Sequence, residues 1–223
     1  MLNPHQTVAS LVLDHSECAP IFQSHRIDFC CRGDLSIKDA CSDRGIDPAA
    51  LIQELARAIA ERMGPDDSDP RTLSTPALIA HIISDYHERL RRTLPFVELL
   101  ASKVRRVHGS KNPYLFDIDA AVRELGGRLG PHIDDEEQVL FPALLAPILD
   151  RTVVATEFAS MLDDHLAIGA LLDRIRSAAE DFRLPDWACN SYQALFSELK
   201  QLEAEIRRHV HLENHVLRPR FSL

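Results

Sequence analysis

Four histidines and two glutamates on regularly spaced apolar stripes are the residues best suited to chemistry in this chain: His87, His132, Glu136, His165, His209 and Glu213. Four of them form two matching His-x-x-x-Glu units. Four positions along an α-helix correspond to about 400°, so each histidine and its glutamate share one helix face, one turn apart. Carboxylates can bridge two cations while imidazoles bind terminally, so the set suits a dinuclear metal site inside a four-helix bundle.

The number of ligands indicates which metal would bind. Six ligands over two ions leave coordination positions open for a small diatomic molecule, whereas structural zinc closes a four-ligand shell. The pattern therefore favours two iron ions, with manganese or zinc as alternatives.

Each of these residues also has a structural interpretation. A lone histidine in an apolar stripe is more often a core residue whose hydrogen bonds are made within the protein. One His/Glu pair is more often a solvent-exposed pair on a helix surface. The joint occurrence of a histidine in register with all four stripes argues against that interpretation. Burying the two glutamates without a cation would also be costly. By spacing, His81 falls on a polar face, His108 lies past the apolar run, and His211 and His215 turn away from His209.

The stripes themselves predict four long helices, over residues 79–104, 118–143, 158–175 and 195–216. Thr75-Pro76 opens the first of them. Connections near 109–113, 147–152 and 183–186 are short and carry turn residues, which favours an up-down-up-down antiparallel bundle. Pro95 and Pro131 are expected to bend their helices.

A Pro-, Gly- and acid-rich segment over 64–70 predicts a linker between two domains. We expect a small helical Cys-Cys domain over 1–64, formed as a three-helix unit, and the bundle over 72–223. Within the first domain, Asp47 is predicted to cap a helix whose first residue is Pro48. The fold class is thus all-α, an antiparallel four-helix bundle with a small N-terminal helical domain.

Composition limits the partners. The net charge is −9 and no long basic stretch occurs, so nucleic acid is not expected as a partner. The longest apolar stretch, 139–149, is too short to cross a membrane, and we see no secretory signal. Five cysteines, an odd count, argue against a disulfide framework, and the expected location is the cytoplasm.

The N-terminal part carries the segment Asp28-Phe29-Cys30-Cys31-Arg32-Gly33. The bundle carries Tyr86-His87, His132-x-x-x-Glu136-Glu137, Asp164-His165 and His209-x-His211-Leu212-Glu213-Asn214. Through these segments the chain resembles, over essentially its whole length, the iron–sulfur cluster repair di-iron proteins, the repair-of-iron-centres family. That family has Asp-aromatic-Cys-Cys-Gly-Gly at the first segment, and this chain has an arginine at the first glycine.

This resemblance implies a hemerythrin-like bundle whose di-iron ligands are the six residues named above. It also implies a protein made under nitric oxide or oxidative stress that helps to restore damaged iron–sulfur clusters, with Cys30 and Cys31 acting near the metal or in redox exchange. The expected partners are nitric oxide or oxygen as a small ligand and damaged iron–sulfur proteins. A homodimer is left open, as is an enzymatic role in reducing nitric oxide.

Two other classes of function remain as alternatives. One is a hemerythrin-like carrier or sensor of oxygen or nitric oxide, although such proteins place an Asp five residues after the last His, where this chain has Asn214. The other is a metal-free helical interaction protein. Reversible binding of oxygen would favour the first, and indifference of thermal stability to histidine removal would favour the second.

Overall fold

The computed structural model describes residues 2–62 and 69–221, and over these the chain is helical. A single isolated antiparallel bridge, between Thr7 and Ser36, is the only β-type pairing within the described ranges. The all-α prediction is confirmed. In the part of the chain that the structure describes, no helix is both long enough and apolar enough to cross a bilayer.

The chain divides into two compact units, one of residues up to 74 together with 210–222, the other essentially residues 75–209. The division falls within one unbroken helical run, α10 (Asn190–Leu212) followed by the π-helix η5 (Glu213–Leu217). Most of the predicted linker, residues 63–68, lies outside the described residues, so the domain limits 1–64 and 72–223 stay a prediction.

The N-terminal segment forms four α-helices within residues 2–62: α1 (Val8–Asp14), α2 (Ala19–Ser24), α3 (Ile37–Arg44) and α4 (Pro48–Glu61). The expectation of a three-helix unit is therefore wrong. A 3-10 turn, η1 (Ser16–Cys18), separates α1 from α2, and both helices are too short to give an apolar period of their own. Asp47 caps α4 by accepting from the N–H of Ala49, and Pro48 is the first helical residue, as predicted.

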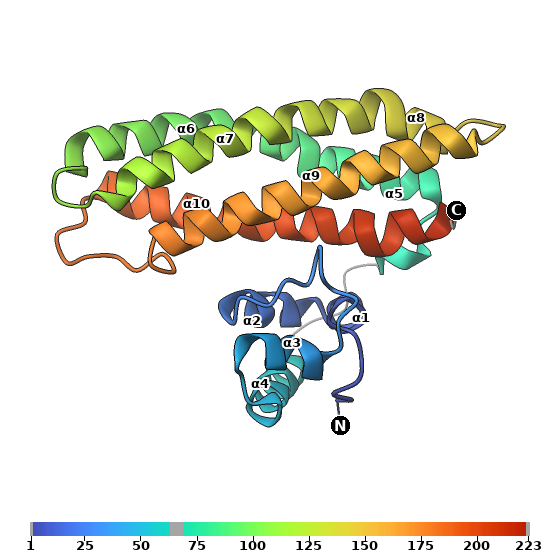
Figure 1. The fold of residues 1–223 in the computed structure, drawn as a ribbon, viewed down its shortest axis with the longest axis horizontal. Helices are drawn as coiled ribbons and strands as arrows, with labels where there is room; N and C mark the ends of the chain where they lie inside the picture. Colours follow the sequence, from blue (N-terminus) through green and yellow to red (C-terminus); the bar gives the residue numbers. More distant parts are fainter. Residues whose placement is uncertain (1, 63–68, 222–223) are drawn as a thin grey trace. The chain divides into compact units, whose positions relative to one another are not determined.

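The bundle is built from longer helices that run side by side in alternating directions (Figure 1). The first consists of α5 (Thr75–Ile82), the π-helix η3 (Ile83–His87) and α6 (Glu88–His108). The second consists of α7 (Tyr114–Asp135), the π-helix η4 (Glu136–Leu140) and α8 (Phe141–Leu144). The third is α9 (Arg151–Ala178), and α10 with η5 is the fourth. The antiparallel four-helix bundle is confirmed.

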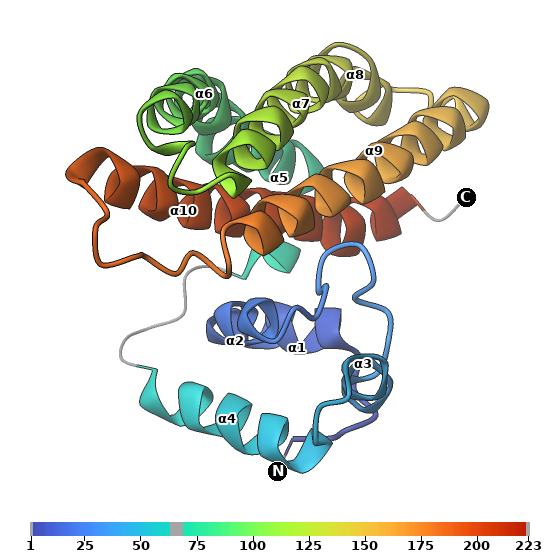
Figure 2. The same cartoon turned by 60° about the vertical axis from the view of Figure 1, so that its left-hand side comes forward.

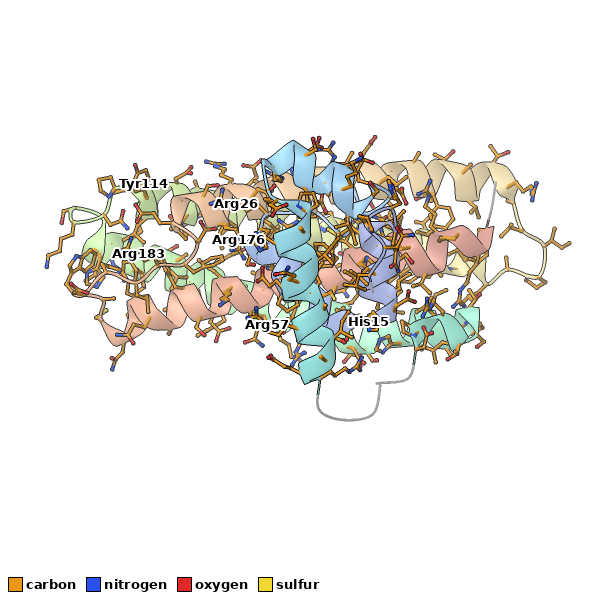
Figure 3. All side chains as sticks on the ribbon, turned by 90° about the horizontal axis from the view of Figure 1, so that it is seen from below. His15, Arg26, Arg57, Tyr114, Arg176 and Arg183 are labelled. Carbon is orange, nitrogen blue, oxygen red and sulfur yellow. The ribbon has the colours of Figure 1, made fainter. Side chains whose placement is uncertain are left out.

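Within the bundle, α7 packs against both α6 and α9 (Figure 2). Pairs of side chains join α10 to its neighbours: Arg176 of α9 contacts Glu203, and Arg89 of α6 contacts Glu205. Figure 3 labels Arg176 on α9 and Tyr114 at the start of α7. The apolar stripes are buried as expected, with Leu90, Leu125 and Ile206 fully inside.

The prolines of the bundle helices and the connection before α10 both bear on predictions from the sequence. The helices α6 and α7 continue without interruption through Pro95 and Pro131. The connection predicted near 183–186 is longer than expected, because α9 ends at Ala178 and α10 begins only at Asn190. Glu180, Asp181 and Phe182 there all adopt positive φ, a conformation that stops a helix.

Two short 3-10 turns complete the described elements, η2 (Pro70–Thr72) and η6 (Arg218–Phe221). They are joined within the first compact unit, since the Arg220 guanidinium donates from Nη1 to the carbonyl oxygen of Leu73 at 2.8 Å and from Nη2 to that of Pro70 at 3.3 Å.

Candidate metal centre

The six predicted ligand residues lie close together in two groups of four. The first group is His87, Glu136, His209 and Glu213, and the second is His132, Glu136, His165 and Glu213. In each group the candidate ligand atoms lie within 4.8 Å of one another. Both glutamates belong to both groups, while each histidine belongs to one. This is the pattern expected when two carboxylates bridge two cations and each cation has its own pair of imidazoles.

Local helix geometry positions these side chains. His132 and His209 each lie in the last turn of an α-helix, and the glutamate four residues on begins a π-helical segment, η4 or η5. His87 is the last residue of the π-helix η3. Single π-turns inside α-helices frequently occur at functional sites, because the wider turn re-aims side chains without breaking the helix.

The distances inside the first group fit a metal ion. Nε2 of His87 lies 2.9 Å from Nε2 of His209 and 3.5 Å from Oε2 of Glu136. Two imidazole nitrogens bound side by side to one ion at about 2.1 Å stand about 3 Å apart. In the second group, Nε2 of His132 lies 3.5 Å from Oε2 of Glu136, and the His132 and His165 rings are 4.9 Å apart.

The burial of the six candidate ligand side chains favours bound cations. All six side chains are almost completely excluded from water, at 3 % exposure or less. Two carboxylates and four imidazoles in such a place are stabilised most directly by cations, since burying unneutralised carboxylates costs several kcal/mol each. The residues present therefore fit two metal ions.

Acidic side chains from outside the two groups lie next to His87 and His132. Nδ1 of His87 lies 2.8 Å from Oε1 of Glu137, which also accepts from Arg91 Nη1 at 2.7 Å. Nδ1 of His132 lies 3.6 Å from a carboxylate oxygen of Asp164. A carboxylate hydrogen-bonded to Nδ1, as Glu137 is to His87, leaves Nε2 as the metal-facing nitrogen and fixes the ring orientation. Tyr86 adds a packing support, since its ring stacks on His209 with centroids 5.7 Å apart.

The pKa of the Glu137 carboxyl group is altered by its neighbours. Its pKa is lowered, although burial alone acts to raise it, because hydrogen bonds from Arg91 and His87 favour the ionised carboxylate. A charged Glu137 is the form that accepts from both groups. It therefore supports the orientation of His87.

Cys30 and Cys31 form a separate cluster with Asp28. Their sulfur atoms lie 3.6 Å apart and are not joined in a disulfide; Cys30 is buried and Cys31 half-buried. Asp28 Oδ1 accepts from the N–H of Cys30 at 3.0 Å, from the N–H of Cys31 at 2.9 Å and from the Cys30 thiol at 3.1 Å. The Asp-x-Cys-Cys segment is thus one tight turn centred on a single carboxylate oxygen.

Residues just after His209 hold this turn in place. His211 Nδ1 donates to the carbonyl oxygen of Phe29 at 3.0 Å, and the Asn214 side chain donates to that of Cys30 at 2.9 Å. His215 Nε2 also lies 2.9 Å from the Cys30 carbonyl oxygen. Burial is the main reason that the pKa of His211 falls to about 3, with the neighbouring His215 as a smaller cause.

Gly33 shows how closely the turn is packed. A Cβ atom at Gly33 would lie 2.4 Å from the carbonyl oxygen of Phe29 and 2.7 Å from Cβ of Ala9. Both are rigid neighbours, so no larger residue fits there. Arg32, where the resembled family has a glycine, points outward instead and pairs with Asp43 at 3.7 Å.

The supporting residues were not assigned from the sequence. Glu137 and Asp164 stand next to ligands in the motifs, and that adjacency was the available signal. His211 and His215 do turn away from His209's face as predicted, but their contacts with Phe29 and Cys30 span more than 180 positions of sequence. His81, as predicted, pairs on the helix surface, with Asp85 at 2.7 Å.

Comparison with known proteins agrees with this arrangement. Residues 78–221 match the hemerythrin family, described as the hemerythrin HHE cation binding domain. Residues 4–59 match ScdA_N, a domain of unknown function (DUF542).

Several relatives are similar over nearly the whole chain. The iron–sulfur cluster repair protein ScdA of Staphylococcus haemolyticus is 33% identical over 224 residues, covering 100% of both chains. The iron–sulfur cluster repair protein YtfE of Yersinia pestis is 31% identical over 216 residues, covering 97% of this chain and 96% of that protein. The chain joins an ScdA_N domain to a hemerythrin HHE cation-binding domain. It therefore belongs to the iron–sulfur cluster repair protein family.

Proposed function

We propose that this protein is a non-haem di-iron protein that binds nitric oxide and supports the repair of iron–sulfur clusters damaged by nitrosative or oxidative stress. The observation that carries the proposal is the sharing of Glu136 and Glu213 by two groups that each have their own pair of histidines. The names of the relatives support the repair role.

In this proposal the six side chains hold two iron ions, and iron in such a set supplies an open coordination position for a diatomic ligand. The chain's own residues do the rest. Glu137, itself held by Arg91, fixes the ring of His87, and Asp164 places a carboxylate 3.6 Å from Nδ1 of His132. The buried surroundings exclude water from the ligand atoms.

Cys30 and Cys31 are proposed as the thiols that exchange electrons or iron with a client protein. Their sulfur atoms lie close enough to act as a pair, and Cys31 is partly accessible. The proposed partners are nitric oxide or oxygen and damaged iron–sulfur proteins. Action in the cytoplasm suits thiols in the reduced state, which a reducing compartment preserves. A homodimer stays a prediction.

The first test is metal content and nitric oxide binding in protein purified without oxygen. We expect about two irons per chain and an optical and paramagnetic response to nitric oxide. His165→Ala should reduce both, while His81→Ala, a surface histidine paired with Asp85, should change neither. Protein that contains no iron and gives no response would contradict the proposal.

The same experiment separates the alternatives. Stoichiometric binding of nitric oxide identifies a binding protein, whereas continuous consumption with an added electron donor identifies a reductase. A stable oxygen complex that forms and dissociates reversibly in air would instead favour a carrier or sensor.

The repair role needs its own test. A hydro-lyase with an exposed [4Fe–4S] cluster, inactivated by nitric oxide, is incubated with iron-loaded protein. We expect recovery of hydro-lyase activity well above that given by the same amount of free iron. The Cys30→Ser/Cys31→Ser double variant should recover less activity although it still binds iron. Equal recovery with free iron alone would contradict a repair role.

A further inference from the structure

A polar cleft opens on the bundle beside the candidate metal centre, between the η3–α6 segment and α10. Its volume is about 600 Å³, within the range of small-molecule sites. Its walls carry three arginines, two carboxylates and a tyrosine: Arg89, Arg92, Arg208, Asp85, Glu205 and Tyr86.

The carboxylates of the cleft are already engaged. Asp85 pairs with His81 at 2.7 Å and accepts from the Ser84 hydroxyl at 2.9 Å. Glu205 pairs with Arg89 at 3.5 Å and accepts from the Gln201 amide at 3.1 Å. Both carboxylates of the cleft therefore already have side-chain partners.

Two of the three guanidinium groups in the cleft have no such partner among the described residues. Over residues 2–62 and 69–221, neither Arg92 nor Arg208 makes a hydrogen bond or ion pair with another side chain. They come from different walls, Arg92 from α6 and Arg208 from α10. Guanidinium groups that line one cleft without a carboxylate partner match the geometry and charge of a carboxylate, sulfate or phosphate group.

Tyr86 connects the cleft with the metal centre. The residue lines the cleft, and its ring stacks on that of His209 at an interplanar angle of 18°. Its hydroxyl has no hydrogen-bond partner within the described part of the chain. A ligand that accepts from this hydroxyl would thus be one side chain away from a candidate metal ligand.

From these observations we infer that the cleft is a binding site for a small oxyanion, a carboxylate- or phosphate-type group held between Arg92 and Arg208 and accepting from the Tyr86 hydroxyl. The inference goes beyond the proposed repair function and does not depend on which metal the centre holds.

Binding is tested by titration calorimetry on the full-length, metal-loaded protein at low ionic strength. Succinate and sulfate are the probes, since both chelate iron weakly, and chloride of equal ionic strength is the reference. We expect saturable binding of about one anion per chain, with a dissociation constant of about 1 mM or tighter. Whether succinate or sulfate binds more tightly tells a carboxylate site from a phosphate-like one.

Matched variants locate the site. Arg92→Gln and Arg208→Gln should each weaken binding about tenfold, the effect of losing one charge-assisted hydrogen bond. Arg106→Gln removes an exposed arginine from the same helix as Arg92 but outside the cleft, and it should leave binding unchanged. Metal content, measured before and after each titration, shows that the centre is intact throughout.

A spectroscopic readout tests the role of Tyr86. Anion binding should give a tyrosine difference absorption that disappears in Tyr86→Phe and persists in Tyr114→Phe, a change at an exposed tyrosine. Absence of saturable binding to both anions in the unaltered protein would overturn the inference. Equal affinities of the Arg92→Gln and Arg106→Gln variants would overturn it as well. Neither result would bear on iron content or cluster repair.

Discussion

The thiol of Cys30 and the Oδ1 atom of Asp28 lie 3.1 Å apart, and the same oxygen accepts from two backbone N–H groups. One carboxylate oxygen thus organises the turn that carries both cysteines. Because Cys30 is only 2 % exposed, any reaction of its thiol with a bulky reagent requires this turn to open.

Replacing Asp28 is therefore expected to expose Cys30. Hydrogen bonds to a charged acceptor are worth about 1.5 to 3 kcal/mol, so Asp28→Ala should raise the population of the open turn about tenfold or more. The measurement is the rate of alkylation of Cys30, followed by mass spectrometry of the digested protein.

Two references make that rate interpretable. Glu61→Ala changes an exposed acid at the end of α4, away from the turn, and it should not alter the rate. Cys18 provides an internal standard, because burial raises the pKa of its thiol to about 12 and keeps it protonated at neutral pH. Identical Cys30 rates in the unaltered and Asp28→Ala proteins would show that Asp28 does not hold the turn.

The ligand set was predictable because helix periodicity is a local property. A glutamate four residues after a histidine shares its face, and an apolar stripe fixes which face is buried. His132 and Glu136 came directly from this rule, and both are buried in one group.

The π-helical segments were not predicted, although the apolar pattern of the sequence is irregular at two of them. Where the stripe passes Tyr86 and His87, or Val139 and Leu140, two adjacent positions compete for the apolar face. Such doublets occur at η3 and η4, where a wider turn shifts the register by one residue, but also at Met161 and Leu162 in the uninterrupted helix α9. A period of 3.6 alone cannot distinguish this shift from an ordinary broad stripe.

The support of the cysteine turn could not be predicted for a different reason. His211 meets Phe29, and Asn214 meets Cys30, across separations of 182 and 184 residues. No spacing rule applies to such pairs, since tertiary packing alone brings them together. For His211, the sequence indicated only that its side chain lies on a different helix face from that of His209.

Sharing of the glutamates gives a prediction about stoichiometry. Glu136→Gln weakens both groups at once, since Glu136 belongs to both, whereas His165→Ala removes a ligand from one. We expect metal content to fall from about two ions per chain to below one in Glu136→Gln, and to about one in His165→Ala. Elemental analysis after gel filtration measures it.

Glu88→Gln is the matched control for that experiment. Glu88 is exposed, directly follows a candidate ligand and belongs to neither group, so its replacement should keep the full metal content. If Glu136→Gln lost no more metal than His165→Ala, the carboxylate would serve one ion only and the bridging arrangement would be wrong.

Acid should destabilise the protein partly through His211. Its pKa is near 6.5 in the unfolded chain and about 3 in the folded one, where burial disfavours the charged ring. Below pH 6.5 the His211 side chain binds a proton in the unfolded chain but not in the folded chain. The free energy of unfolding therefore falls between pH 6.5 and 3, by at most about 1.4 kcal/mol per pH unit from this residue.

His211→Asn keeps a side-chain donor for the Phe29 carbonyl oxygen but cannot titrate. Urea unfolding of metal-free protein between pH 7 and 4 should thus show a shallower decline in the variant. Removing the metal beforehand makes the contribution of the ligand histidines equal in both proteins. His5→Asn, at an exposed position, should follow the unaltered protein. Parallel curves for unaltered protein and His211→Asn would contradict the assignment.

Glu203 lies buried between two buried arginines, at 2.8 Å from Arg176 Nη2 and 3.1 Å from Arg207 Nε. Glu203→Ala leaves both guanidinium groups in the bundle without this carboxylate, which should cost about 3 to 5 kcal/mol. At about 2 to 4 °C per kcal/mol, the melting temperature measured by calorimetry should fall by about 10 °C. Glu124 also contacts two arginines but is 49 % exposed, so Glu124→Ala should cost less than about 1 kcal/mol. Equal losses in the two variants would mean that burial adds nothing to this network, and that water reaches Glu203 in solution.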